Sequence, residues 1–228
     1  MTQPPTIVAP RVPARLSSIE LDAQDALDDD ETIEGAEVRG DVSGCVARGV
    51  TFEGCRLVGL RLVGADLERL RLHDCVLDTC DLSGAILESA SWRRVELRDC
   101  RLAGAVALGA SWRHVRLVRC QAPSMALRSV TVEQIAVDDS DLTGADWSGS
   151  RLTDVAWTRC RLTRLELSHA TLERVRFDAC ELDGVRGALA LRGATIDVAS
   201  IVPVALGLFD AVGITIDHGD VDGTDGDG

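Results

Sequence analysis

The sequence predicts an all-β solenoid, a chain wound into stacked coils, with a short helix at its C-terminus. Residues 40–184 read as twenty-nine consecutive five-residue units without insertion or deletion. The third residue of each unit is large and apolar almost throughout, and the first is small or apolar. This period fits neither an α-helix nor a flat strand. A chain that turns two of every five side chains inward must keep turning, so coils stacked by backbone hydrogen bonds are the simplest solution.

The repeat block resembles the pentapeptide-repeat family in its motif of a small residue, Asp or Asn, Leu and two variable residues. Ala65-Asp-Leu, Ala145-Asp-Trp and Cys80-Asp-Leu-Ser-Gly84 carry that motif. The resemblance implies a right-handed, four-sided parallel β-helix with four units in each coil. Residues 20 apart would then stack at about 4.8 Å, and residues 40–184 would form just over seven coils in a rod of roughly 34 Å.

A second pattern independently supports a coil of twenty residues. Ala90-Ser-Trp-Arg-Arg-Val recurs twenty residues later as Ala110-Ser-Trp-Arg-His-Val, so we expect Trp92 and Trp112 to stack. The second-position residues on one side mostly alternate in charge: Asp41, Arg61, Asp81, Arg101, Gln121, Asp141, Arg161 and Glu181. Opposite charges favour such cross-strand neighbours, so these ladders need no ligand to explain them.

The residues before the repeats suggest two segments. Residues 1–15 hold four prolines and few large apolar side chains, so they are expected to be a disordered or extended tail. Residues 16–39 mix apolar residues with the acidic run at 28–31. They predict an irregular, acidic N-terminal cap, because a bare β edge at the first coil would invite aggregation.

The residues after the repeats predict a C-terminal cap. The phase slips by one after Leu182, and two further units extend the β-helix over residues 40–198. Residues 199–211 are apolar nearly all round and predict a helix, with a short strand at 214–216 completing a cap over 199–216. The helix should pack on the last coil or on a second subunit. Residues 217–228 should be a disordered acidic tail.

All eight cysteines occupy the inward first position, where a free thiol acts as a small apolar group. Reduced core filler is the favoured interpretation, with disulfides and a metal site as weaker alternatives. Reduced thiols predict a cytoplasmic protein. No apolar run is long enough for a transmembrane helix, and the N-terminus shows no signal-peptide pattern.

Three groups of residues are candidate interaction sites. A basic belt in residues 90–119 has a net charge of +5, and it could be a solvated face or dock an acidic group such as residues 28–31. An apolar strip on outward positions could meet a partner. The apolar C-terminal helix could cap the rod or form a homodimer. The belt comprises Arg93, Arg94, Arg98, Arg101, Arg113, His114, Arg116 and Arg119; the strip comprises Ile86, Val106, Ala126 and Leu108; the helix contributes Ile201, Leu206 and Phe209.

No motif indicates catalysis, because the sequence has no nucleophile–base pair, metal-ligand spacing or phosphate-binding glycine loop. An enzyme and a cofactor are therefore not expected. The first hypothesis is a non-catalytic scaffold or protein-interaction module whose partner is unknown, without membrane contact.

The resemblance implies an alternative function: a DNA-mimicking modulator of DNA gyrase or topoisomerase that gives quinolone protection and dimerises through its C-terminal helix. The charge distribution disfavours it, since the repeats carry −2 of the total −13 and the remainder lies in residues 1–39 and 185–228. A DNA mimic needs charge of one sign along its rod. The net negative charge also makes nucleic acid an unfavoured partner.

Overall fold

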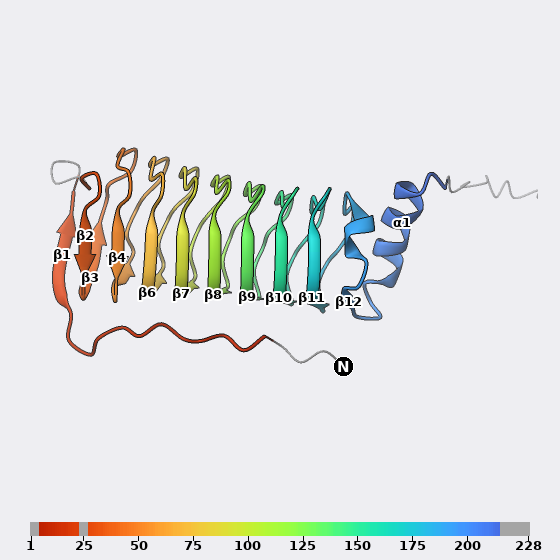
Figure 1. Ribbon diagram of the computed structural model, residues 1–228, viewed down its shortest axis with the longest axis horizontal. Helices are drawn as coiled ribbons and strands as arrows, with labels where there is room; N and C mark the ends of the chain where they lie inside the picture. Colours follow the sequence, from red (N-terminus) through yellow and green to blue (C-terminus); the bar gives the residue numbers. More distant parts are fainter. Residues whose placement is uncertain (1–4, 23–26, 215–228) are drawn as a thin grey trace, which may run out of the picture.

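The computed structural model, which describes residues 5–22 and 27–214, is a parallel β-solenoid with one short C-terminal helix (Figure 1), so the predicted fold class is confirmed. One side of the stack runs in the order β1-β3-β5-β6-β7-β8-β9-β10-β11-β12. The elements are β1 (Ser17–Leu21), β2 (Thr32–Glu34), β3 (Ala36–Gly40), β4 (Thr51–Glu53), β5 (Arg56–Val58), β6 (Arg71–Asp78), β7 (Ser91–Arg98), β8 (Ser111–Val118), β9 (Thr131–Asp138), β10 (Arg151–Thr158), β11 (Thr171–Asp178), η1 (Ala188–Leu191), β12 (Thr195–Ile196) and α1 (Ile201–Ala211).

The coil length of twenty residues is confirmed by the pairing register. Ser91 pairs with Ser111, which pairs with Thr131, and each pair is parallel. Every fifth residue forms a corner with positive φ, as at Arg69 (60°) and Asp74 (54°). Four such corners in each coil give the solenoid four sides. Non-glycine residues rarely adopt this left-handed conformation, so each corner must be held by the hydrogen bonds on both sides of it.

The core consists of the first and third positions, as the repeat pattern predicts. Trp92 and Trp112 stack with ring centroids 4.4 Å apart, which confirms their predicted contact. The aromatic stack continues edge-on to Trp147 and Trp157. All four indole N–H groups are buried without an acceptor among the described residues. Backbone carbonyls along the coils already bond the next coil, so few acceptors remain inside.

The eight cysteines are free thiols, as the reduced-filler interpretation expected. Cys75 and Cys100 illustrate their bonding: each thiol donates to a backbone carbonyl oxygen, of Phe52 (3.2 Å) and Leu77 (3.5 Å) respectively. Burial raises the pKa of Cys75 to about 12, so this thiol stays protonated at neutral pH.

The β-helix begins earlier than the boundary expected at residue 40. β1, β2 and β3 lie in the segment expected to be an irregular cap, and they are rungs of the same sheet. Ile19 pairs with Val38 and Ile33 with Phe52, a spacing of 19 residues rather than 20. Coils one residue shorter break the five-residue phase, which is why the pattern hid them. Gly40 lies at the shortened corner. A larger residue does not fit there, because its Cβ would lie 1.8 Å from the Leu21 carbonyl oxygen.

The N-terminal residues 5–15, expected to be a disordered or extended tail, form an extended segment that runs along the outside of the rod from β1 towards the later coils (Figure 1). The Arg11 N–H donates to Asp74 Oδ1 at 3.0 Å, and the Val8 N–H donates to His114 Nδ1 at 3.4 Å. We call this segment the arm. Its backbone donors, which a side-chain pattern does not encode, attach it to the rod.

At the C-terminal end, β12 pairs with β11 at a spacing of 19 residues, in keeping with the predicted phase slip. α1 contacts η1 and buries Val204 against the last coil. Ser200 is the N-cap residue of α1, and Asp197 accepts hydrogen bonds from Ser200 and from the Ala179 N–H. Residues 215–228, and with them most of the expected strand and the acidic tail, lie outside the described residues.

None of the helices in the described part of the chain is long and apolar enough to cross a membrane.

Replacing Leu102 by Asp should unfold the protein, because its side chain is fully buried and an unpaired charge there costs several kcal/mol. Circular dichroism during thermal melting measures the effect. The control is Ala103→Asp at the neighbouring, partly exposed position, which should melt close to the wild type. A native spectrum with unchanged melting for the Leu102 variant would show that the assigned register is wrong.

Candidate interaction surfaces

The basic belt contains one well-shielded ion pair at the corner between two sides of the rod. Arg94 donates to Asp74 Oδ1 and Oδ2, both at 2.5 Å, and the two side chains are 13% and 12% exposed. Arg94 also donates to His73 Nε2 at 2.6 Å, and His73 Nδ1 lies 3.3 Å from a carboxylate oxygen of Glu53. The hydrogen bond from Arg94 holds the pKa of Asp74 below its usual range.

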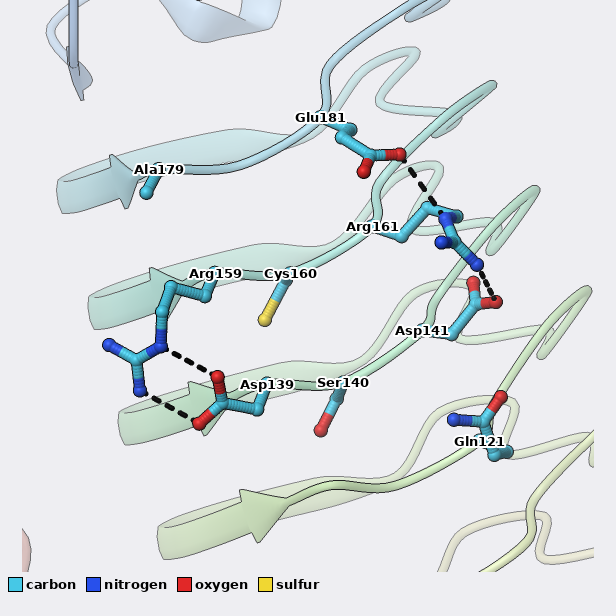
Figure 2. Close-up of a pocket in the computed structure, with 9 residues that line it drawn as sticks. All are labelled: Gln121, Asp139, Ser140, Asp141, Arg159, Cys160, Arg161, Ala179 and Glu181. Carbon is cyan, nitrogen blue, oxygen red and sulfur yellow. Dashed lines mark hydrogen bonds and ion pairs between the residues drawn. The ribbon is translucent and has the colours of Figure 1, made fainter.

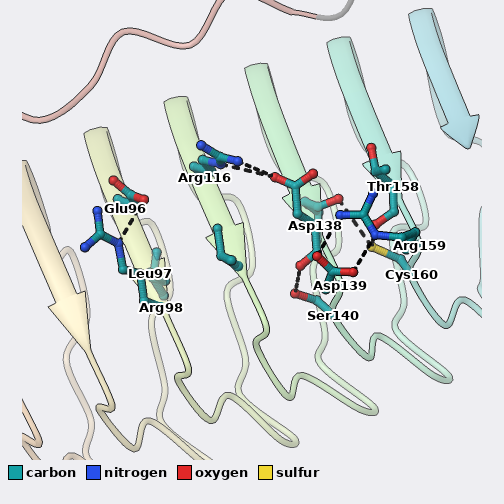
Figure 3. Close-up of polar contacts among 12 residues, drawn as sticks. Glu96, Leu97, Arg98, Arg116, Asp138, Asp139, Ser140, Thr158, Arg159 and Cys160 are labelled. Atoms are coloured by element: carbon teal, nitrogen blue, oxygen red, sulfur yellow. Dashed lines mark hydrogen bonds and ion pairs between the residues drawn. The ribbon is translucent and has the colours of Figure 1, made fainter.

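The other belt arginines are largely neutralised by carboxylates, most of them from neighbouring coils. Figure 3 shows two of these pairs, Arg98–Glu96 and Arg116–Asp138. Further pairs are Arg101–Asp81, Arg113–Glu133 and Arg119–Asp99. Among the residues that the structure describes, Arg93 is the belt arginine without a carboxylate within 4.0 Å. The belt therefore does not form a patch with a net charge of +5, because most of its arginines are paired with nearby carboxylates.

The acidic run at residues 28–31 does not reach the belt. Asp29 accepts a hydrogen bond from the Arg48 N–H at 2.7 Å, and the Asp30 N–H donates to the Arg48 carbonyl, which places the run at the first coils. The segment that does reach the belt is the arm, through His114. The hypothesis that the acidic run of the same chain docks on the belt is therefore wrong, because the run is occupied several coils away.

Two ion-pair ladders border an open groove of about 370 Å³ (Figure 2). Arg159 holds Asp139 through two hydrogen bonds of 2.6 and 2.7 Å. Arg161 bridges Asp141 at 3.1 Å and Glu181 at 3.2 Å. The groove is lined by Gln121, Asp139, Ser140, Asp141, Arg159, Cys160, Arg161, Ala179 and Glu181. The hydrogen bond from Arg159 lowers the pKa of Asp139, so this carboxylate is ionised and paired rather than available as a base.

The two potential nucleophiles of this groove are inactive as placed. The Ser140 hydroxyl donates to the Asp138 carbonyl at 2.8 Å and accepts from the Cys120 N–H at 2.9 Å. The second potential nucleophile is Cys160. A hydrogen bond with Cys180 and burial raise the pKa of the Cys160 thiol, so its thiolate form is disfavoured. Within the described residues, no group of three or more His, Cys, Asp or Glu side chains could hold a metal ion.

The apolar strip comes together as the sequence predicts. Ile86 pairs with Val106, and Val106 pairs with Ala126, in parallel bridges on one side of the rod. The bridges to Asp66 and Asp146 bound the strip at both ends, so it covers three rungs, or about 10 Å. Leu108 beside it is half-buried. A strip of this size is small for a stable protein interface.

The C-terminal helix presents a larger apolar surface. Val204 and Leu208 face the last coil and line a cavity of about 240 Å³ with Leu191 and Ile196. On its other faces Ile201, Leu206 and Phe209 are 52%, 49% and 41% exposed. Val202, Val212 and Leu189 are exposed as well. The structure thus brings together the three predicted helix residues on a surface that nothing in the described chain covers.

Sequence reasoning missed the site formed by Asp74 and the arm. Asp74 and Arg94 fall at corner positions, where the repeat pattern accepts many residue types. Gly54, in the same column of corners, gave a weak signal, because a Cβ there would lie 3.2 Å from the Cδ of Pro13 in the arm. A glycine in a column of larger side chains can mark such a close approach.

Parallel rungs, four left-handed corners in each coil and inward apolar pairs define a β-solenoid built from five-residue units. The family model for pentapeptide repeats matches eight copies at residues 48–84, 75–106 and 138–178, which confirms the predicted resemblance to that family over these residues. A search of curated proteins found no significant sequence match.

Several solved pentapeptide-repeat structures are similar to this chain. Full-length QnrB1, a plasmid-mediated fluoroquinolone resistance protein, is 21% identical, with 88% of this chain and 99% of QnrB1 covered and a TM-score of 0.32. HetL from Nostoc sp. strain PCC 7120, involved in heterocyst differentiation regulation, is 16% identical, with 73% and 87% covered and a TM-score of 0.26.

Replacing Asp74 by Asn should lower the free energy of unfolding by about 1–3 kcal/mol, because Arg94 would keep its burial and lose its ionic partner. Denaturant unfolding at neutral pH measures the loss. Asp99→Asn, in the exposed pair with Arg119, is the matched control and should change stability much less.

The contribution of Asp74 should also depend on pH. Its folded-state pKa is lowered from an ordinary value of 3.8, so its stabilising effect is present above that value and is lost as the pH falls through the lower folded pKa. The difference between wild type and Asp74→Asn should therefore shrink in strong acid. A difference that stays constant down to that range would contradict this assignment.

Proposed function

We propose that this protein is a non-catalytic scaffold that forms a homodimer through its C-terminal helix. The single observation that supports this function best is the exposed apolar surface of α1, where Ile201, Leu206 and Phe209 are about half exposed at the end of the rod. An exposed apolar surface of this kind is characteristic of an interaction site. A second copy is a suitable occupant, because a two-fold interface needs only one self-complementary patch.

The sides of the rod support a role as a spacer rather than as a charged ligand. Their charges alternate from coil to coil, as in the Asp141–Arg161–Glu181 ladder. Opposite charges about 4.8 Å apart cancel beyond a Debye length of about 8 Å at physiological salt. A dimer through α1 would present two such rods to protein partners at a fixed separation.

Modulation of DNA gyrase is the second function that the sequence suggested. The apolar α1 is compatible with it, since a helix-mediated dimer is part of that resemblance. The paired charges on the rod oppose it, because a DNA-binding surface selects a continuous run of negative charge. We therefore rank it below the scaffold.

Light scattering on the wild type should give the mass of a dimer, and the double variant Leu206→Asp, Phe209→Asp should give a monomer. The physical reason is that two buried carboxylates would oppose association. The matched control is Val46→Asp, an apolar residue that is 71% exposed on an early coil, and it should remain dimeric. A monomeric wild type would contradict the proposed dimer.

Purified protein should not inhibit DNA supercoiling by gyrase, and it should not protect gyrase from a quinolone. The reason is the near-neutral rod. A supercoiling assay over a range of salt concentrations measures both effects, with the Leu206→Asp, Phe209→Asp variant in parallel. Salt-sensitive inhibition by the wild type would contradict the ranking and favour the gyrase function.

A further inference from the structure

The arm lies along one column of corners, which we call the corner column: Gly54, Asp74, Arg94 and His114. Pro13 lies against Gly54, the Arg11 N–H reaches Asp74, and the Val8 N–H reaches His114. The arm therefore supplies two main-chain N–H donors, and the corner column supplies two side-chain acceptors. Asp74 is buried in this arrangement, although corner positions face outward.

The spacing of the arm matches the spacing of the coils. Val8 and Arg11 are three residues apart, and an extended chain covers about 9–10 Å in three residues. Their acceptors Asp74 and His114 are two coils apart, which is also about 9.6 Å. Pro10 and Pro13, which have no N–H, fall at positions where the arm donates no hydrogen bond to the column. The arm is thus suited to this column in both length and donor positions.

One of the two acceptors, His114, stops being an acceptor at Nδ1 when that nitrogen gains a proton. Nδ1 of His114 can accept the Val8 N–H only while it carries no proton, because a protonated imidazole is a donor at both nitrogens. We propose that the arm is an acid-released strap, which His114 holds on the corner column while its Nδ1 is unprotonated and which leaves the column when that nitrogen gains a proton.

The surroundings of His114 favour the neutral, arm-binding form. Arg113 lies beside it on β8, Arg93 and Arg94 face it from β7, and Glu133 faces it from β9. Residues 5–10 of the arm have no titratable side chain. Burial, followed by Arg113, lowers the pKa of His114, while Glu133 raises it. A proton on His114 would add a positive charge next to these arginines.

The second acceptor does not follow the same pH course. Arg94 keeps the pKa of Asp74 below its usual range, so Asp74 still accepts the Arg11 N–H when His114 becomes protonated. Release should therefore begin at the Val8 end and extend towards Arg11. If docking of the arm lowers the pKa of His114 by one unit, protonation of His114 weakens docking about tenfold. Docking of the arm is thus favoured above the pKa that His114 has in the docked state, and it is lost as the pH falls through that pKa.

The test uses full-length, ¹⁵N-labelled protein and measures the backbone dynamics of the Val8 and Arg11 amides. At pH of about 7.5 both amides should be rigid, with order parameters near 0.85. At a second, acidic pH, chosen so that the imidazole signals of His114 show it protonated, the Val8 value should fall below about 0.6. His114→Asn keeps a neutral acceptor at the δ position and tolerates the left-handed corner (φ 54°), so its arm should stay docked at both pH values. His114→Arg should release the Val8 end at both.

Two histidines serve as controls. His169→Asn changes another left-handed corner (φ 61°) at a distant position in the rod. His73→Gln removes the histidine that lies next to Asp74. Both variants should keep the wild-type pH dependence. An arm with equal dynamics at both pH values in the wild type would overturn the proposal. So would release of the His114→Asn arm at the wild-type midpoint, or loss of the pH dependence in His73→Gln.

Discussion

The structure depends on the hydrogen bonds between one coil and the next. The backbone of each rung bonds to the residues about twenty positions away, as the Leu102 N–H bonds to the Gln121 carbonyl at 2.7 Å. This ladder fixes the spacing of the coils and holds corners such as Asp74 in a conformation that is otherwise unfavourable. It also uses the backbone acceptors, so the interior accommodates four tryptophans without offering their N–H groups a partner.

The same ladder determines the outer surface. Side chains twenty residues apart become neighbours, so an arginine meets the carboxylate of the next coil, as Arg159 meets Asp139. Individually such exposed pairs stabilise little, but together they remove long-range charge from the sides. What distinguishes one part of the rod from another is therefore where the repeat stops: the apolar helix at one end and the arm that leaves the first coil at the other.

The repeat allowed the fold, the inward positions and the Trp92–Trp112 stack to be predicted from the sequence, because each depends on side-chain type at a fixed period. The first coils were missed because Ile33 stacks on Phe52 at 19 residues, outside that period. The position of the arm could not be predicted, since the backbone N–H groups of Val8 and Arg11 attach it. The belt arginines were recognised, but their partners, such as Glu133 for Arg113, become visible only when the coils are stacked.

The aromatic stack has a spectroscopic consequence. The chain has no tyrosine, and its four tryptophans lie between residues 92 and 157, in contact with one another. Ultraviolet absorbance and intrinsic fluorescence therefore come almost entirely from the middle and later coils. Solenoids can lose terminal coils before the central ones, because each coil contacts only its neighbours. Fraying of the first coils, and any movement of the arm, would leave the tryptophan signal nearly unchanged, so the optical transition describes only part of the rod.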